Sequence, residues 1–232
     1  MSMTRTFITL AALTLVSNTL EAKRSCRVVF PERPQDALKM AYLFDGSKSQ
    51  SVTLPSKNLS EVIELPDGEL TIAMTADKIS DSKSLPPKAP TLKIPEDVTD
   101  FYMIISPDPE NPDLPIKMTL VDTGGGKLKP GETLWCNFTE DRIVAKLGST
   151  DMSVDPMGRT ISKDPAPASG YYIAKFTYQI KGNGEFLPIT EQNWWHDAAS
   201  KHLGFIVSSG DKLPKIYFFR DFRDPEPVKK KK

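Results

Sequence analysis

The stretch NWWHDAASKH, residues 193–202, contains both histidines of the chain and two of its three tryptophans. Two imidazoles can contribute to a transition-metal site, but two ligands are too few unless Asp197 or a partner chain adds another. An exposed indole among polar side chains can instead stack on a sugar ring or anchor a protein contact. The residue types therefore offer metal chemistry or binding through aromatic contact.

The segments on either side determine how these side chains lie. EFLPITEQNWW and HLGFIVSS alternate like two strands, so HDAASK is expected to be the turn of a β-hairpin. A five-residue turn, 197–201, places Trp195 opposite Leu203 on the inner face and brings the two histidines together, whereas a four-residue turn buries Trp194 instead. The five-residue turn predicts an outward binding surface, extended by the PDPENPD loop at 107–113 and made of Trp194, His196, Asp197 and His202. A structural aromatic pair covered by a neighbouring part of the protein is the alternative.

Two hydrolase hypotheses compete with binding. LVDTGGG resembles the catalytic turn of aspartic peptidases at Asp122-Thr123-Gly124, where two carboxylates share a proton. The chain has one such motif, so a homodimer has to supply the second carboxylate. The other hypothesis is a metal held by His196 and His202. GxSxG, HExxH and CxxC motifs are absent from the sequence. The sequence therefore predicts neither a cofactor nor a metal site. The preferred prediction is a protein that is not an enzyme.

The N-terminus predicts export. A basic MSMTR precedes the apolar run TFITLAALTLV, the pattern of a signal peptide, and cleavage is expected after Ala22. No later segment has the ~20 apolar residues of a membrane-spanning helix. Lys and Arg total 30 and so do Asp and Glu, so the chain lacks the basic excess that nucleic-acid binding requires. The predicted location is the periplasm or the cell exterior.

Period-2 alternation predicts the fold. In residues 70–76 and 172–180 apolar side chains alternate with polar ones, and turn sequences such as PDGE and KPGE separate such segments. The pattern predicts an all-β protein of two small antiparallel, immunoglobulin-like β-sandwiches in tandem, with one larger sandwich as the alternative. The predicted parts are a signal peptide 1–22, sandwiches 23–122 and 128–224, a glycine-rich hinge 123–127 and a basic tail 225–232.

The two cysteines, Cys26 and Cys136, leave two interpretations open. An oxidising compartment allows them to pair, which would tie the first strand to the second half of the chain. An isolated cysteine on a strand is as often a small buried apolar residue.

Several strings indicate a relationship: LKPGETLWCNFTEDRIVAKLGS, SGYYIAKFTYQI, NWWHD and KIYFFRDF in the second half, with DFYMIISPDPENPDLPIKM in the first. Together they resemble a family of uncharacterised exported bacterial proteins, a likeness that covers most of the mature chain and implies export but no activity. We therefore expect a binding or structural module of the cell envelope. Its expected partner is a protein or an envelope polysaccharide, and its oligomeric state is open. An assembly factor that offers an edge strand is a further alternative.

Overall fold

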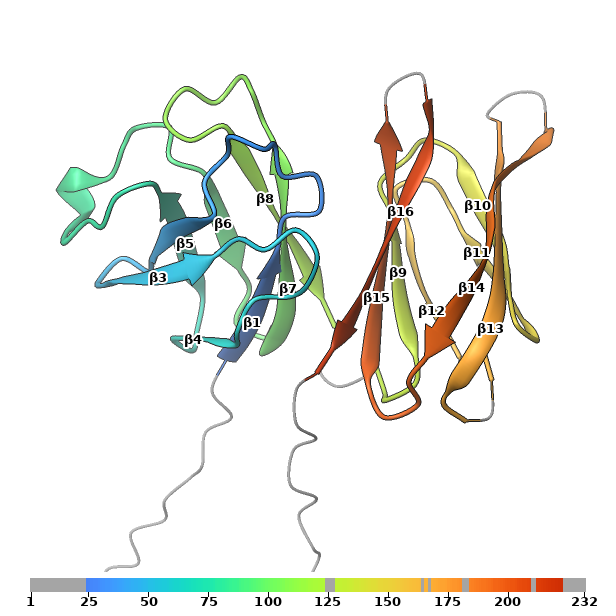
Figure 1. Ribbon diagram of the computed structural model, residues 1–232. Helices are drawn as coiled ribbons and strands as arrows, with labels where there is room; N and C mark the ends of the chain where they lie inside the picture. Colours follow the sequence, from blue (N-terminus) through green and yellow to red (C-terminus); the bar gives the residue numbers. More distant parts are fainter. Residues whose placement is uncertain are drawn as a thin grey trace, which may run out of the picture.

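The structure is a computed structural model that describes residues 24–123, 128–163, 165–166, 168–180, 184–209 and 212–222 (Figure 1). The predicted signal peptide 1–22, most of the hinge 123–127 and the basic tail 225–232 lie outside these residues. The described chain is all-β, as predicted: it forms sixteen strands and one short 3-10 helix at Ser82–Ser84.

The first half of the chain forms eight strands: β1 (Arg24–Val29), β2 (Met40–Phe44), β3 (Ser49–Thr53), β4 (Ile63–Leu65), β5 (Leu70–Thr75), β6 (Thr91–Ile94), β7 (Asp100–Pro107) and β8 (Ile116–Asp122). The second half forms eight more: β9 (Thr133–Asn137), β10 (Arg142–Leu147), β11 (Thr150–Val154), β12 (Arg159–Ser162), β13 (Gly170–Gln179), β14 (Phe186–His196), β15 (Lys201–Ser209) and β16 (Lys212–Asp221).

These strands form four small sheets. Sheet A has the order β4-β1-β7-β8 and sheet B the order β3-β2-β5-β6. In the second half, sheet C is β12-β9-β15-β16 and sheet D is β11-β10-β13-β14. Adding eight to each strand number of sheets A and B gives sheets C and D, so both halves have the same strand order. No sequence repeat predicts this correspondence.

The prediction of purely antiparallel sheets was wrong for one strand pair in each half. β1 pairs with β7 in parallel, and β9 pairs with β15 in parallel, whereas the other pairs are antiparallel. A parallel pair needs a long crossover connection. Each half provides one, because the chain passes through the other sheet before its seventh strand returns beside its first.

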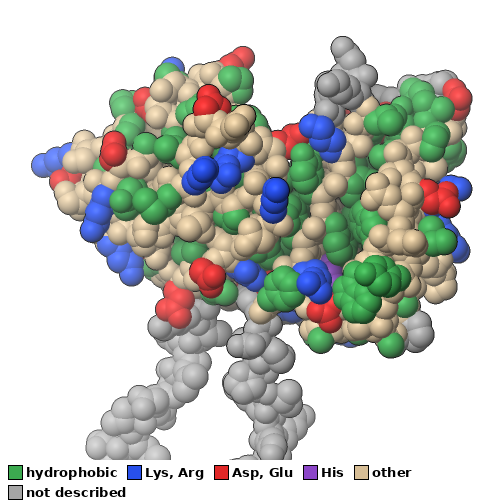
Figure 2. Space-filling view, viewed as in Figure 1, with side chains coloured by type: hydrophobic (Ala, Val, Ile, Leu, Met, Phe, Trp, Pro, Cys, Tyr) green, Lys and Arg blue, Asp and Glu red, His purple; other side chains and the backbone are tan. Residues whose placement is uncertain are grey.

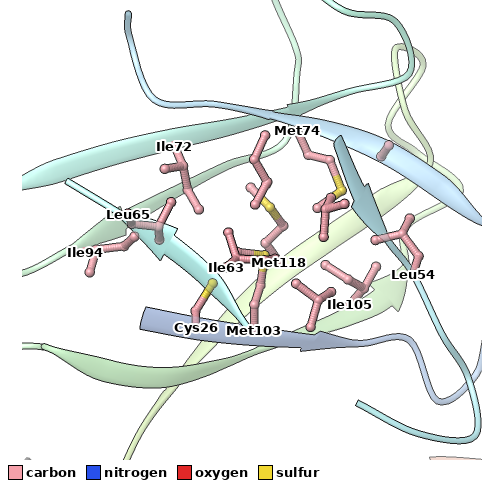
Figure 3. Packing of buried hydrophobic residues seen from close by; sticks show 14 of the residues in the cluster. Cys26, Leu54, Ile63, Leu65, Ile72, Met74, Ile94, Met103, Ile105 and Met118 are labelled. Carbon is pink, nitrogen blue, oxygen red and sulfur yellow. The ribbon is translucent and has the colours of Figure 1, made fainter. Parts of the chain in front are cut away.

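Three hydrophobic cores place the sheets in the order B-A-C-D. The first core lies between sheets A and B, as in a β-sandwich, and Figure 3 shows its packing around Cys26, Met103 and Met118. Neighbouring residues on a strand point to opposite faces, and Val28 joins this core whereas Val29 joins a second one between sheets A and C. The third core lies between sheets C and D and is centred on Trp135. The central sheets A and C are therefore buried on both faces.

A buried ion pair crosses the contact between sheets A and C. Arg27 of β1 donates from Nη1 to Asp221 Oδ1 of β16 at 2.5 Å, and the Tyr102 hydroxyl of β7 donates to Asp221 Oδ2 at 2.5 Å. Arg27 also donates from Nε to the Ser60 carbonyl oxygen at 2.6 Å. Both charged groups are removed from water but hydrogen-bonded, which is the condition for burying them.

A glycine opposite a tryptophan determines the packing of the core between sheets C and D. Trp135 of β9 is fully buried, and its Nε1 donates to Ser162 Oγ at 3.1 Å. Its register partner on β15 is Gly204, where an added Cβ would lie 2.0 Å from Trp135 Cε3. The indole therefore occupies the space that a side chain at position 204 would fill.

The disulfide hypothesis was wrong. Cys26 and Cys136, both among the described residues, are buried and not bonded to each other. The Cys26 side chain belongs to the core between sheets A and B, and that of Cys136 to the core between sheets A and C. Sheet A thus separates the two thiols. Burial raises the pKa of the Cys136 thiol to about 12, so it stays protonated and unreactive at neutral pH.

Candidate functional site

The turn between the two histidines joins two sheets, so the predicted hairpin was wrong. β14 pairs with β13 in sheet D, whereas β15 pairs with β9 and β16 in sheet C. The turn is held at its ends: the Gly131 amide donates to the Ser200 carbonyl oxygen at 2.7 Å, and the Ala198 amide donates to Ser169 Oγ at 2.9 Å. The chain therefore crosses the sandwich at this point.

The predicted orientation of the tryptophans was reversed. Trp194 packs against the core between sheets C and D, while Trp195 points outward with 45% of its surface exposed. In an unbroken strand Trp195 lies on the same face as the apolar residues Leu187 and Ile189, which also favours an inward position. A β-bulge shifts the register of β13 and β14, so that Phe176 pairs with Thr190 but Thr177 pairs with Pro188. One extra residue exchanges the faces of everything beyond it.

The predicted contact between the histidines is confirmed, but its place on the surface was wrong. The His196 and His202 rings lie 5.6 Å apart between centroids and face each other across the interior, with 2% and 0% of their surfaces exposed. His202 stacks on Phe218 at 5.2 Å, and His196 meets Tyr172 edge-on. Within the described residues, neither ring nitrogen of His202 has a hydrogen-bond partner.

This environment makes stability depend on the protonation of His202. Burial, reinforced by the neighbouring His196 ring, lowers the pKa of His202 from 6.5 to about 4. Between these values the unfolded chain binds a proton that the folded chain does not, so the free energy of unfolding falls as the pH drops from 6.5 to 4, by at most about 3 kcal/mol. Urea unfolding at pH 7, 5.5 and 4.5 measures this loss. His202→Phe keeps an aromatic ring but removes the titration, so its curve is expected to be flatter than that of the parent. The same pH slope in both proteins would contradict the assignment.

The two histidines do not form the hypothesised metal site. In the described part of the chain no three His, Cys, Asp or Glu side chains come together as ligands. Asp197, the expected third ligand, accepts from Ser200 Oγ at 2.7 Å and from the Ala199 amide at 3.1 Å. The hydrogen bond from the Ser200 hydroxyl is the largest contribution that lowers the pKa of Asp197. Its carboxylate also lies 3.6 Å from Arg220 Nη1. Asp197 therefore holds the turn.

A hollow of about 820 Å³ lies beside this turn. Its walls come from β14 and the first residues of β13 on one side, β16 with the following residue Phe222 on another, and Lys57 and Asn58 of the first half on a third. β14 and β16 are edge strands of sheets D and C. We call this feature the aromatic hollow. In Figure 2 hydrophobic side chains gather around the lower ends of these two strands, with Lys and Arg side chains among them.

Aromatic rings form most of the lining. Tyr171 and Trp195 are cross-strand partners and meet edge-on, with centroids 5.0 Å apart. Deeper, Trp194 contacts Phe218 at 5.0 Å, and both pack against the core. Tyr171 and Phe222 are 75% and 62% exposed. Apolar rings so open to water are typical of an interaction site.

The polar groups of the hollow are amides and cations. Asn58 and Asn193 contribute side-chain amides, and Lys57 and Arg220 contribute positive charge. The Arg220 guanidinium lies 4.4 Å over the Phe222 ring. Of the predicted surface, only Trp194 lines the hollow. Asp197 lies 3.6 Å from the lining residue Arg220, and His196 and His202 are buried. The sequence prediction missed Tyr171, Arg220 and Phe222, although their strings YYIAKF and FFRDF are conspicuously aromatic.

Two polar side chains of the PDPENPD loop, Asn111 and Asp113, are hydrogen-bonded to the protein itself. Asn111 Nδ2 donates to the Lys88 carbonyl oxygen at 2.9 Å, and Asp113 Oδ2 accepts from the Lys88 amide at 2.7 Å. Asn111 Oδ1 also accepts from the amides of Asp113 and Leu114. The loop is tied to the segment around residue 88, and it contributes no residue to the aromatic hollow.

Asp122 ends the edge strand β8 of sheet A, and Gly124 of its motif lies outside the described residues. The Asp122 carbonyl oxygen accepts from Arg159 Nη1 at 3.5 Å, and the Thr123 hydroxyl donates to the Asp100 carbonyl oxygen at 2.9 Å. The dimeric peptidase needs a second chain and stays a hypothesis.

No protein-family model matches the sequence, and no curated protein matches it. Within its described residues the chain has no helix with the length and apolar character needed to span a bilayer. The resemblance to exported bacterial proteins therefore stays a prediction.

Proposed function

We propose that the protein is an exported, non-catalytic binding module of the bacterial cell envelope, and that its ligand is an extended polymer held in the aromatic hollow. The observation that carries the proposal is the pair of exposed rings, Tyr171 and Trp195, at the mouth of an 820 Å³ hollow. Large rigid rings supply contact area at low entropic cost and dominate binding energy where they are buried by a ligand.

The proposal includes a domain arrangement. Each half of the chain acts as an immunoglobulin-like domain, and the two stand in tandem around the segment 123–127. The shared strand order of sheets A and B with sheets C and D supports this division. The hollow uses both halves, because Lys57 and Asn58 come from the first and the other lining residues from the second.

We expect Trp195→Ala to weaken binding at least about tenfold, because removing a ring that a ligand covers costs roughly 1.4 kcal/mol or more. The measurement is native affinity electrophoresis of the full chain through gels that contain dextran, polygalacturonate or carboxymethylated, unfolded lactalbumin. At least one of these polymers is expected to retard the protein.

Ile173→Ala is the matched control. Ile173 lies on the same outer face of sheet D and is 55% exposed, but it does not line the hollow. The proposal fails if no polymer retards the protein, or if Trp195→Ala and Ile173→Ala change the retardation equally.

A further inference from the structure

We infer that the ligand of the aromatic hollow is an anionic polysaccharide, whose sugar rings stack on Trp195 and Tyr171 and whose acidic groups pair with Arg220 and Lys57. This inference rests on the proposed function and adds the chemical class of the ligand. It follows from three features of the hollow: its rings, its charge and the construction of its edges.

The rings fit sugars because they present apolar surface beside hydrogen-bonding groups. A pyranose has an apolar face of C–H groups and a rim of hydroxyls. Trp195 and Tyr171 offer ring surface for the faces, and the amides of Asn58 and Asn193 offer both donors and acceptors for the hydroxyls. No hydrogen bond within the described residues occupies these two side-chain amides.

The charged residues of the hollow favour an acidic ligand. The lining contains Arg220 and Lys57 and no Asp or Glu. Asp197 lies 3.6 Å from Arg220 Nη1, but its carboxylate is also held by the Ser200 hydroxyl. An ion pair of that length at the surface is weak. The planar Arg220 guanidinium, positioned over Phe222 at 4.4 Å, keeps donors for a carboxylate or sulfate group.

The edge strands are unsuited to an added peptide strand. Strand addition needs a continuous row of backbone donors and acceptors. β14 contains Pro188 beside its β-bulge, and β16 contains Pro214, and proline has no N–H to donate. These interruptions shorten the row of backbone groups that an added peptide strand could pair with, which favours recognition by side chains.

The first half of the chain provides an internal comparison. β6 and β8 hold the places in sheets B and A that β14 and β16 hold in sheets D and C. β6 has 4 residues, TLKI, whereas β14 has 11 and carries both tryptophans of the hollow. The same fold thus has a short, ring-free edge in one half and a long aromatic edge in the other.

The test compares four polymers in native affinity gels: polygalacturonate, dextran sulfate, uncharged dextran and unfolded carboxymethylated lactalbumin, which is an anionic polypeptide. We expect retardation by polygalacturonate or dextran sulfate and not by dextran or the polypeptide. Arg220→Gln is expected to weaken it about tenfold or more, because a charge-assisted hydrogen bond is lost. Lys57→Gln, on an exposed loop where it cannot disturb the fold, is expected to weaken it severalfold.

Lys175→Gln is the matched control, because it removes the same charge from the outer face of sheet D, where Lys175 pairs with Glu191 at 3.1 Å. Binding that all three variants reduce equally is unspecific charge attraction and overturns the inference. Retardation by dextran as strong as by the acidic polymers overturns the choice of an anionic chain but leaves the binding module standing. Retardation by the polypeptide alone, lost in Trp195→Ala, also overturns the polysaccharide but not the module.

Discussion

Replacing Asp221 by alanine is expected to lower the free energy of unfolding by about 3 to 5 kcal/mol. The carboxylate is 3% exposed and neutralises the buried guanidinium of Arg27, and it accepts the hydroxyl of Tyr102. Without it, Arg27 remains in the contact between sheets A and C with an unpaired charge. Urea denaturation followed by tryptophan fluorescence measures the loss.

Two comparisons make this result specific. Glu191→Gln breaks an exposed pair with Lys175 and is expected to lose at most about 1 kcal/mol. The double variant Arg27→Met, Asp221→Leu removes both charges and is expected to regain most of the stability lost in Asp221→Ala. If Asp221→Ala is no worse than Glu191→Gln, the ion pair does not hold the halves together.

The second large effect is expected for Trp135→Ala, which removes the centre of the core between sheets C and D and costs about 3 to 5 kcal/mol. The indole is fully buried and contacts the rings of Phe176 at 5.2 Å, Phe218 at 5.9 Å and Trp194 at 6.2 Å between centroids. Thermal and urea unfolding measure the change. Because Trp194 and Phe218 also line the aromatic hollow, ligand binding should weaken in the same variant.

Gly204 tests the same packing from the other side. Gly204→Ala places a methyl group against Trp135 and is expected to cost about 1 to 3 kcal/mol through overpacking. Gly170→Ala is the control, because a Cβ there meets nothing within 4 Å, and its effect should stay within about 0.5 kcal/mol. The double variant Trp135→Leu, Gly204→Ala should lose less than the sum of its single variants. Equal stability of Gly204→Ala and Gly170→Ala would show that the indole can move aside.

The alternation of apolar and polar residues predicted the strands because one face of a sheet is buried. It also predicted the buried face where only every second residue is apolar. Leu70, Ile72 and Met74 are buried as expected. In LKMAYLF both sets of alternate residues are apolar, so the pattern could not show which set is buried. Ala41, Leu43 and Phe44 are the buried residues there, and Met40 is 49% exposed.

The aromatic hollow was predictable only in part. The string NWW indicates its aromatic character. Its walls, however, come from separate segments around residues 57, 171, 194 and 220, which no local sequence pattern connects. The orientation of the tryptophans depends on a bulge at Phe176 and Thr177, and a bulge leaves no consistent mark in a sequence.

The shared strand order of the halves was invisible for a different reason. In the first half, Cys26 pairs with Phe101 between the parallel strands; in the second, Trp135 pairs with Gly204. A small residue faces a large one in both pairs, but on opposite strands. Cores conserve total volume more strictly than they conserve residue identity, so two similar sandwiches need not share a recognisable sequence.

The position of Asp221 also orders events while the chain emerges from a ribosome, N-terminus first. Sheets A and B are complete once β8 has emerged. The face of sheet A that carries Val29 and Tyr102 is then still exposed to solvent, and Arg27 lacks its counter-ion. Strands β9, β15 and β16 of sheet C cover that face, and β16, the last strand among the described residues, supplies the carboxylate. A chain that lacks β16 therefore keeps Arg27 without its counter-ion, so the charge balance of the first half depends on a strand made nearly two hundred residues later in the sequence.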